Sequence, residues 1–190
     1  MRISTKLAGI CGVVTPLIAL VFIASCIAIH PWFTFPGNAL SDLGSVDTSY
    51  NYIYNIGMVS TGLVGLVFAA GVRELVGRIG LVGIAIFSLG LVSLILVGVF
   101  PGGTGPHVTV SLAFFGLCTL GTFIVGIDQL LAPSSRPWGV FLMGVIALGL
   151  VSVILDGTIP HLGAAIPETI GAFAFSEFSI VFGLRLLDLL

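Results

Sequence analysis

Apolar residues fill the chain in six long blocks, separated by short breaks that are polar or rich in glycine and proline. A helix rises about 1.5 Å per residue, so roughly 20 apolar residues cross the roughly 30 Å hydrocarbon core of a bilayer. We therefore predict an all-α polytopic membrane bundle of six transmembrane helices, forming a single transmembrane domain over residues 1–190. The predicted spans are residues 7–29, 56–72, 79–100, 108–131, 138–155 and 169–187, with Tyr52 as an alternative start of the second span.

The composition agrees with a membrane protein and excludes several other classes. Charged residues make up 7% of the chain, against about a quarter in soluble domains, and 57% of the residues are hydrophobic. Mean hydropathy is +1.25. Such a chain cannot cover a globule with polar surface, and it lacks the charge that disordered segments and nucleic-acid binders need. Its three cysteines, Cys11, Cys26 and Cys118, fall inside predicted spans, where they are small packing residues rather than a disulfide framework.

The basic residues predict the orientation in the membrane. With six spans, every lysine and arginine falls on one side, and none falls on the other. The positive-inside rule assigns the basic side to the cytoplasm. We therefore predict a multi-pass protein of the cell membrane with both termini cytoplasmic. The basic residues are Arg2, Lys6, Arg73, Arg78, Arg136 and Arg185.

One stretch of the sequence recurs at an offset of 59 residues. Residues 89–101, LGLVSLILVGVFP, align with residues 148–160, LGLVSVILDGTIP, and nine of the thirteen positions are identical. Because the matches include a serine and a proline, we favour a duplication over chance similarity between apolar helices. Spans two and three would then form a hairpin equivalent to spans four and five, related by a parallel repeat about an axis along the membrane normal.

The outward side of the predicted bundle holds all the histidines and several acidic residues without any lysine or arginine. Two or three imidazoles with a carboxylate suit zinc, so a divalent metal site is one interpretation. No His-Glu-x-x-His motif or pair of histidines one helical turn apart supports it locally. A polar pocket for another ligand, or helix caps and interfacial residues without a ligand, are the alternatives. The residues concerned are His30, His107, His161, Asp42, Asp47, Asp156 and Glu168.

The first outward loop, residues 30–55, is too long to be a simple turn. Loops of this length in compact domains tend to be functional or to fold locally. Its aromatic residues suit the outer membrane interface. We predict a lid over the outer end of the bundle, in which Asn38 or Ser41 caps a short helix. Asn38, Ser41 and Asp42 are then either backbone caps or groups that line a pocket.

One acidic residue falls deep inside a predicted span. Glu177 lies nine residues after Glu168, which puts it about 13 Å into the membrane. A charged carboxylate at that depth costs at least about 2.5 kcal/mol, so we predict that Glu177 faces the bundle interior, protonated or hydrogen-bonded. A proton or cation relay and a purely structural role are both open. Asp128, near the cytoplasmic end of span four, is expected to reach toward Arg136 or Arg73.

The strings His30-Pro-Trp-Phe and Gly37-Asn-Ala-Leu-Ser-Asp-Leu-Gly44 resemble the DUF998 family of bacterial and archaeal membrane proteins. Phe100-Pro101 with the following His107, and the late Pro167-Glu168, extend the resemblance over nearly the whole chain. The resemblance implies a polytopic helical bundle but no reaction, because the family is named for its unknown function. The resemblance also implies which polar positions are typical of the family. They are His30, Asn38, Ser41, Asp42, His107 and Glu168.

These residues lead to three functional hypotheses. The first is a module that binds or senses a lipid headgroup, a small cation or a metal in the outward pocket. Its partners would be the lipid bilayer and such a ligand, and we expect no nucleic acid. The second is a metal-dependent hydrolase of a lipid ester or phosphoester, with a divalent metal such as zinc held by His30, His107 and His161. No Gly-x-Ser-x-Gly elbow points to a serine hydrolase. The third is proton or cation transport past Glu177. The predicted pocket residues are His30, Asn38, Ser41, Asp42, His107, Asp156, His161 and Glu168.

Overall fold

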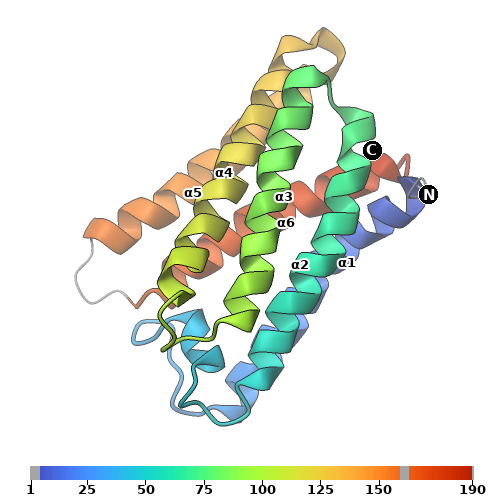
Figure 1. Ribbon diagram of the computed structural model, residues 1–190. Coiled ribbons are helices and arrows are strands. Elements are labelled where there is room, and N and C mark those ends of the chain that lie inside the picture. The colour runs from blue at the N-terminus through green and yellow to red at the C-terminus, as the bar shows by residue number, and fades with distance from the viewer. Residues whose placement is uncertain (1–4, 159–162, 190) are drawn as a thin grey trace.

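The computed structural model describes residues 5–158 and 163–189, and of residues 152, 153 and 155–157 the backbone alone. Within these ranges the chain forms six long helices and no strand (Figure 1). All six are long and apolar enough to cross a membrane, which confirms the predicted all-helical bundle with six spans. The helices are α1 (Thr5–Ile29), α2 (Tyr52–Val72), α3 (Arg78–Val99), α4 (His107–Leu131), α5 (Arg136–Thr158) and α6 (Ala165–Leu186), with short 3₁₀ helices η1 (Leu40–Gly44), η2 (Arg73–Leu75) and η3 (Pro133–Ser135) between them.

All six helices begin before the spans predicted from hydropathy, by one to four residues. α2 begins at Tyr52, which is the alternative start, α5 begins at Arg136 rather than residue 138, and α6 begins at Ala165 rather than residue 169. A span predicted from hydropathy stops where polar side chains or loop residues begin. The helix itself continues for as long as its backbone groups find hydrogen-bond partners. Glu168 therefore lies in the first turn of α6 rather than in the loop before it.

Neighbouring helices in the chain run antiparallel, and the two termini lie close together (Figure 1). Ala8 near the start of α1 packs against Gly71 near the end of α2, and Gly9 lies beside Leu187, which follows α6. The described lysines and arginines lie at this same end of the bundle, in helix ends or the turns between them. That this end faces the cytoplasm, and that the hairpins α2–α3 and α4–α5 are a parallel repeat, stay predictions.

The core combines close helix contacts at glycine with packed phenylalanine rings. Gly183 of α6 approaches α1 so closely that an added Cβ would lie 2.8 Å from the carbonyl oxygen of Gly9 and 3.1 Å from the Cα of Gly12. In lipid, helices associate through van der Waals contact, and small residues permit this close approach. Beside this contact, the ring of Phe178 meets that of Phe87 edge-on, with centroids 5.1 Å apart. These contacts hold α6 against α1 and α3.

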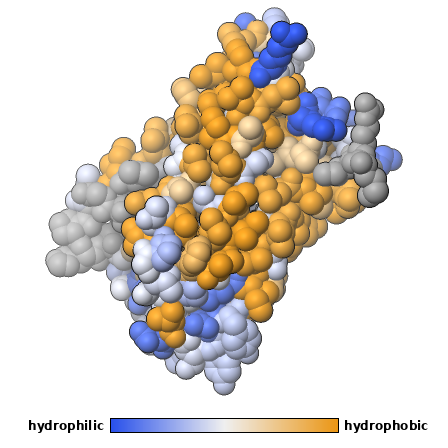
Figure 2. Space-filling model, viewed as in Figure 1, coloured by the Kyte–Doolittle hydropathy of each residue, from blue (hydrophilic) through white to orange (hydrophobic). Residues whose placement is uncertain are grey.

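Apolar side chains cover the outside of the helices. Figure 2 shows a broad hydrophobic surface over the helices, with hydrophilic residues gathered toward the ends of the molecule. Leu20, Val21 and Val140 are 60%, 61% and 63% exposed. In water so extensive an apolar surface would cause aggregation, whereas in a bilayer it meets the acyl chains of the lipids. The surface is therefore that of a multi-pass membrane protein.

A polar cluster closes the end of the bundle where the termini lie. The side-chain amide of Gln129 on α4 donates to the carbonyl oxygen of Leu75 at 3.0 Å, and its oxygen accepts from the guanidinium of Arg185 at 3.1 Å. The Arg185 guanidinium also lies 4.4 Å from the ring centroid of Trp138 on α5. One buried amide therefore joins α4 and α6 to the turn that follows α2.

Asp128, the neighbour of Gln129, fastens the turn between α2 and α3. Its carboxylate accepts a hydrogen bond from the backbone N–H of Gly77 at 2.8 Å. The expectation that it reaches toward Arg136 or Arg73 is wrong, because Arg73 pairs with the adjacent Glu74 at 3.2 Å and Arg136 lies against a backbone carbonyl. A short, buried carboxylate takes the backbone donor that faces it rather than a distant flexible cation.

Candidate ligand pocket

The outer loop folds into a lid whose 3₁₀ helix, η1, is capped by two carboxylates. Asp42 accepts a hydrogen bond from the backbone N–H of Ala39 at 2.9 Å. Glu168, from α6, accepts one from the backbone N–H of Leu40 at 2.6 Å. These N–H groups precede or begin the helix and have no acceptor within it. Glu168 therefore connects the lid directly to the bundle.

Asn38 and Ser41 take other positions in the lid. The side-chain oxygen of Asn38 accepts from the backbone N–H of Thr34 at 3.0 Å, and its amide donates to Asp42 at 3.3 Å. Its carbonyl oxygen accepts from the N–H of Ala165 at 2.8 Å, which makes a second link to α6. The prediction that Asn38 or Ser41 caps the short helix is wrong, because the acidic side chains reach its N–H groups instead. Ser41 lines the cavity beneath η1.

His30 fastens the lid to the end of α1. Its side chain is 4% exposed, with Nδ1 lying 2.7 Å from the carbonyl oxygen of Cys26 and Nε2 lying 2.7 Å from that of Ser49. The ring bridges α1 to the residues just before α2. In this conformation both ring nitrogens are engaged by the backbone, so His30 acts as a clamp of the loop and offers no nitrogen to a metal.

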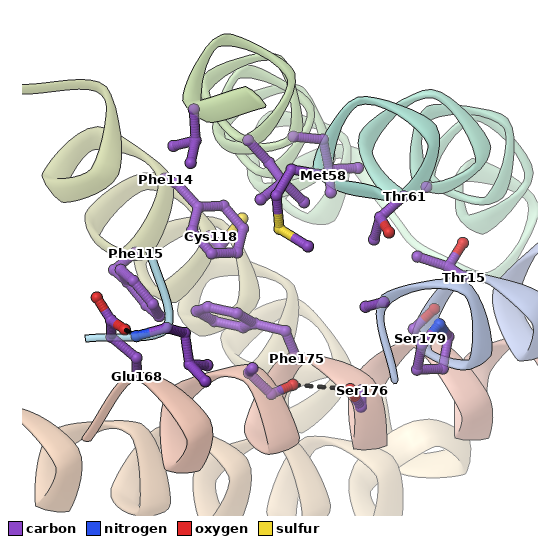
Figure 3. Close-up of a pocket in the computed structure, with 18 of the residues that line it drawn as sticks. Thr15, Met58, Thr61, Phe114, Phe115, Cys118, Glu168, Phe175, Ser176 and Ser179 are labelled. Carbon is purple, nitrogen blue, oxygen red and sulfur yellow. Dashed lines mark hydrogen bonds between the residues drawn. The ribbon is translucent and has the colours of Figure 1, made fainter. Parts of the chain in front are cut away.

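A cavity of about 120 Å³ lies beneath η1 and between α1, α2, α3, α4 and α6. Figure 3 shows Phe114, Phe115 and Phe175 together at one side of it, with Met58 and Thr61 on α2 across from them. Aliphatic and aromatic side chains make up most of its wall. The cavity therefore suits the apolar part of a ligand.

The polar groups of the cavity form two sets. Deep in the bundle, the hydroxyls of Thr15 and Ser176 each donate to a carbonyl oxygen of their own helix at 2.7 Å. These hydroxyls are already satisfied and need nothing from a ligand. Ser41, Ser111 and Glu168 lie instead at the end of the cavity that η1 covers. The wall thus changes from apolar in the middle of the bundle to polar under the lid.

A larger groove of about 670 Å³ lies on the outside of the bundle between α4, α5 and α6. Gly116 of α4 helps to leave this space open, because no atom of another described segment lies within 4 Å of where its Cβ would be. Ser111, Phe115, Glu168 and Phe175 line both the groove and the cavity. These four residues, which we call the boundary residues, separate the buried cavity from a groove that faces the membrane.

Sequence reasoning found part of this pocket. Of the predicted residues, Ser41 and Glu168 line the cavity, and His30, Asn38 and Asp42 hold the lid above it. The side chain of Asp156 and the whole of His161 lie outside the described residues.

Ser111 and the phenylalanines of the boundary were missed. The spacing of His107 and Ser111, one helical turn apart, was a usable signal for the serine. The phenylalanines carried no signal, because apolar residues fill every span.

Glu177 does not face the interior, and that prediction is wrong. It is an exposed residue of α6 that lines neither the cavity nor the groove. The buried face of α6 carries Ala174 and Phe178, whereas Glu177 follows the 60% exposed Phe173 by one turn on the outer face. Its position is set by the pattern of small and aromatic residues that α6 presents to α1 and α3.

The predicted zinc site gains no support from the arrangement of ligands. Within residues 5–158 and 163–189, no group of three or more histidine, cysteine, aspartate or glutamate side chains is placed to hold a metal. The Nδ1 atom of His107 lies 2.8 Å from the carbonyl oxygen of Phe100, so this ring too is anchored to the backbone.

Six apolar helices, a lid at one end and a groove open to lipid define a multi-pass helical membrane protein. The chain belongs to the family described as Protein of unknown function (DUF998), whose family model matches residues 13–185. This match covers most of the chain and confirms the resemblance drawn from the sequence. No curated protein and no solved structure matches the chain.

Replacing Glu168 with alanine should loosen the lid while the bundle stays folded. The variant removes the carboxylate that accepts the Leu40 N–H, a kind of hydrogen bond worth about 1.5–3 kcal/mol. We expect amide hydrogen exchange across residues 39–45 to accelerate about tenfold or more. Hydrogen-exchange mass spectrometry of the purified protein measures this, with peptides from α3 as the internal control. Unchanged exchange in the lid would contradict the assigned link.

Proposed function

We propose that this protein binds an amphipathic lipid in the cavity beneath η1 and takes it from the bilayer through the groove between α4, α5 and α6. The observation that carries the proposal is that the same four boundary residues line both spaces. A lipid lying in the groove therefore needs only side-chain movements at the boundary to extend into the cavity. Such a route lets the apolar part of the ligand stay out of water throughout.

The sizes and the polarity of the two spaces support a lipid over a small polar ligand. Ligand pockets commonly measure about 300–1,000 Å³, and the groove, at about 670 Å³, falls in this range. The cavity, at about 120 Å³, takes a smaller apolar part, such as the end of a chain. Because the ligand comes from lipid and not from water, van der Waals contact with the wall is what holds this part in the cavity.

The polar end of the ligand belongs under the lid. Ser41, Ser111 and Glu168 lie together at that end of the cavity, and a hydroxyl or cationic headgroup suits the Glu168 carboxylate. By the positive-inside prediction this end faces outward from the cell membrane, so the bound lipid would come from the outer leaflet.

The other hypotheses have less support. A metal site and a metal-dependent hydrolase need a cluster of ligands, and the described residues supply none. Transport past Glu177 needs a polar path, whereas this residue lies on the outer face of α6, away from the cavity. A small cation at Glu168 would share the carboxylate with the Leu40 N–H inside a mostly apolar wall.

The proposal predicts that lipid co-purifies with the protein and that filling the two spaces displaces it. Gly116→Leu projects into the groove, and Ala172→Leu projects into the cavity. We expect each variant to retain less than about a fifth of the lipid bound to the wild type, a loss of about 1 kcal/mol of binding free energy. Native mass spectrometry of the full chain in mild detergent measures bound lipid per molecule.

Two exposed residues of α5 that line neither space provide matched controls. Gly144→Leu and Ala147→Leu add the same side chains at those positions, and we expect both to retain wild-type amounts of lipid. Equal lipid in all four variants, or no lipid on the wild type, would contradict the proposal.

A further inference from the structure

Ser111 differs from other hydroxyl residues on the helices in the partner of its hydroxyl group. Ser88 and Ser176 each donate to the carbonyl oxygen four residues earlier, at 2.8 Å and 2.7 Å. The hydroxyl oxygen of Ser111 lies instead 3.5 Å from Nε2 of His107, one turn earlier on α4. A hydroxyl that faces an imidazole is the arrangement that general-base activation of a serine requires.

The second nitrogen of His107 sets the tautomer of the ring. Nδ1 lies 2.8 Å from the carbonyl oxygen of Phe100, which is an acceptor, so Nδ1 carries the proton. In the neutral ring Nε2 then presents its lone pair to the Ser111 hydroxyl. Ser111, His107 and the Phe100 carbonyl thus form a nucleophile, a base and a group that orients the base. Nucleophile–base contacts are often longer before a substrate is bound.

The serine of this pair lies where a lipid can reach it. Ser111 is a boundary residue, lining the apolar cavity and the membrane-facing groove, whereas His107 is 9% exposed at the first residue of α4. Helical side chains point toward the N-terminus of their helix, so the Ser111 hydroxyl lies over the first turn of α4. The positive end of the helix dipole there favours negative charge that develops near the hydroxyl.

From this geometry we propose that Ser111 is a catalytic nucleophile and His107 its general base in the cleavage of an acyl ester of an amphipathic lipid. This inference rests on the proposed lipid binding and adds a reaction to it. It needs no metal, unlike the hydrolase considered from the sequence, and the serine lies outside a Gly-x-Ser-x-Gly elbow.

The reaction proceeds in two balanced steps. The Ser111 oxygen attacks the ester carbonyl carbon as Nε2 of His107 takes the hydroxyl proton, and the tetrahedral intermediate then expels the lipid alcohol, which receives that proton. The acyl chain is left as an ester of Ser111. Water, deprotonated by His107, then attacks this ester, and the fatty acid leaves as the proton returns to Ser111.

A long-chain alkyl fluorophosphonate tests the nucleophile directly. The serine oxygen displaces fluoride from phosphorus, so the adduct stays on the residue that reacted and is located by mass spectrometry of the digested full chain. We expect an adduct on Ser111 in the wild type and none in Ser111→Ala. Ser88→Ala is the matched control, because Ser88 bonds to its own helix and lines neither the cavity nor the groove, and it should be labelled like the wild type.

His107→Asn separates the base from the structural role of the ring. The asparagine amide can still donate to the Phe100 carbonyl, but it cannot accept the serine proton. We expect the rate of labelling at saturating probe to fall at least about 100-fold while the probe concentration for half-maximal rate changes little. Hydrolysis of a long-chain 4-nitrophenyl ester should fall in parallel.

The possible results distinguish the reaction from the binding. Absence of an adduct on Ser111, in protein that still co-purifies with lipid, overturns the nucleophile and leaves the lipid proposal intact. Labelling of Ser111 that His107→Asn does not slow overturns the base. An adduct on Ser111 together with lipid content that Gly116→Leu does not change supports the pair and contradicts the lipid proposal alone.

Discussion

Gly121→Ala should destabilise the bundle although it adds a single methyl group. The new Cβ would lie 2.5 Å from the backbone nitrogen of Phe87, 2.8 Å from its Cα and 2.7 Å from the carbonyl oxygen of Gly83. All three atoms belong to the backbone of α3, so no side chain can turn away to make room. We expect a loss of about 1–3 kcal/mol, which is typical of overpacking, and a lower midpoint of thermal unfolding by circular dichroism.

Gly116→Ala, on the same helix, is the control for this prediction. Its Cβ meets no atom of another described segment within 4 Å, because the residue borders the open groove. Replacing a helical glycine with alanine favours the helix by up to about 1 kcal/mol. We therefore expect unchanged or slightly raised stability. Equal effects at both positions would contradict the close approach of α3 and α4.

Gln129→Leu should cause the other large loss of stability. Gln129 is 1% exposed, and the variant removes both the donor to the Leu75 carbonyl and the acceptor of the Arg185 guanidinium. Each of the two groups left without a partner costs about 1–3 kcal/mol, so we expect a total loss of about 2–6 kcal/mol. Unfolding in increasing sodium dodecyl sulfate, followed by circular dichroism, measures the change.

A double-mutant cycle with Arg185→Leu tests the cause of that loss. The Arg185 guanidinium lies over the rings of Trp138 and Phe182, at 4.4 and 4.6 Å, so a leucine at this position also has apolar neighbours. If the unpaired guanidinium is what makes Gln129→Leu costly, the double variant should lose at least about 1 kcal/mol less than the sum of the single variants. Additive losses would show that the two side chains act independently.

The spans were predictable because the bilayer imposes a length and a polarity on any segment that crosses it. All six predicted blocks are helices, and the errors lay at their ends, as in α6, which begins at Ala165 rather than residue 169. The lid was predictable as a folded segment from its length and its aromatic residues. Its link to α6 was not, since Glu168 lies 128 residues after Leu40, the residue whose N–H donates to it.

The candidate site was predictable only at residues whose polar side chains stand out in an otherwise apolar sequence. Glu168 and Ser41 were among the predicted pocket residues, and they line the cavity. The inward direction assigned to Glu177 was wrong, because hydropathy gives the depth of a residue but not the side of the helix that packs. Ser111 stood out only when its distance to His107 was known.

The sequence by itself determined that this chain has six segments long and apolar enough to cross a membrane and that it belongs among DUF998 proteins. Both follow from local features, the hydrophobic length of each segment and short strings of residues, the longest of them in the first loop. Only the tertiary structure decided which faces of α4 and α6 meet, and so where the groove and the cavity lie. In lipid almost every face of an apolar helix is acceptable, so the packing depends on where glycines let two backbones approach, which is a property of pairs of helices.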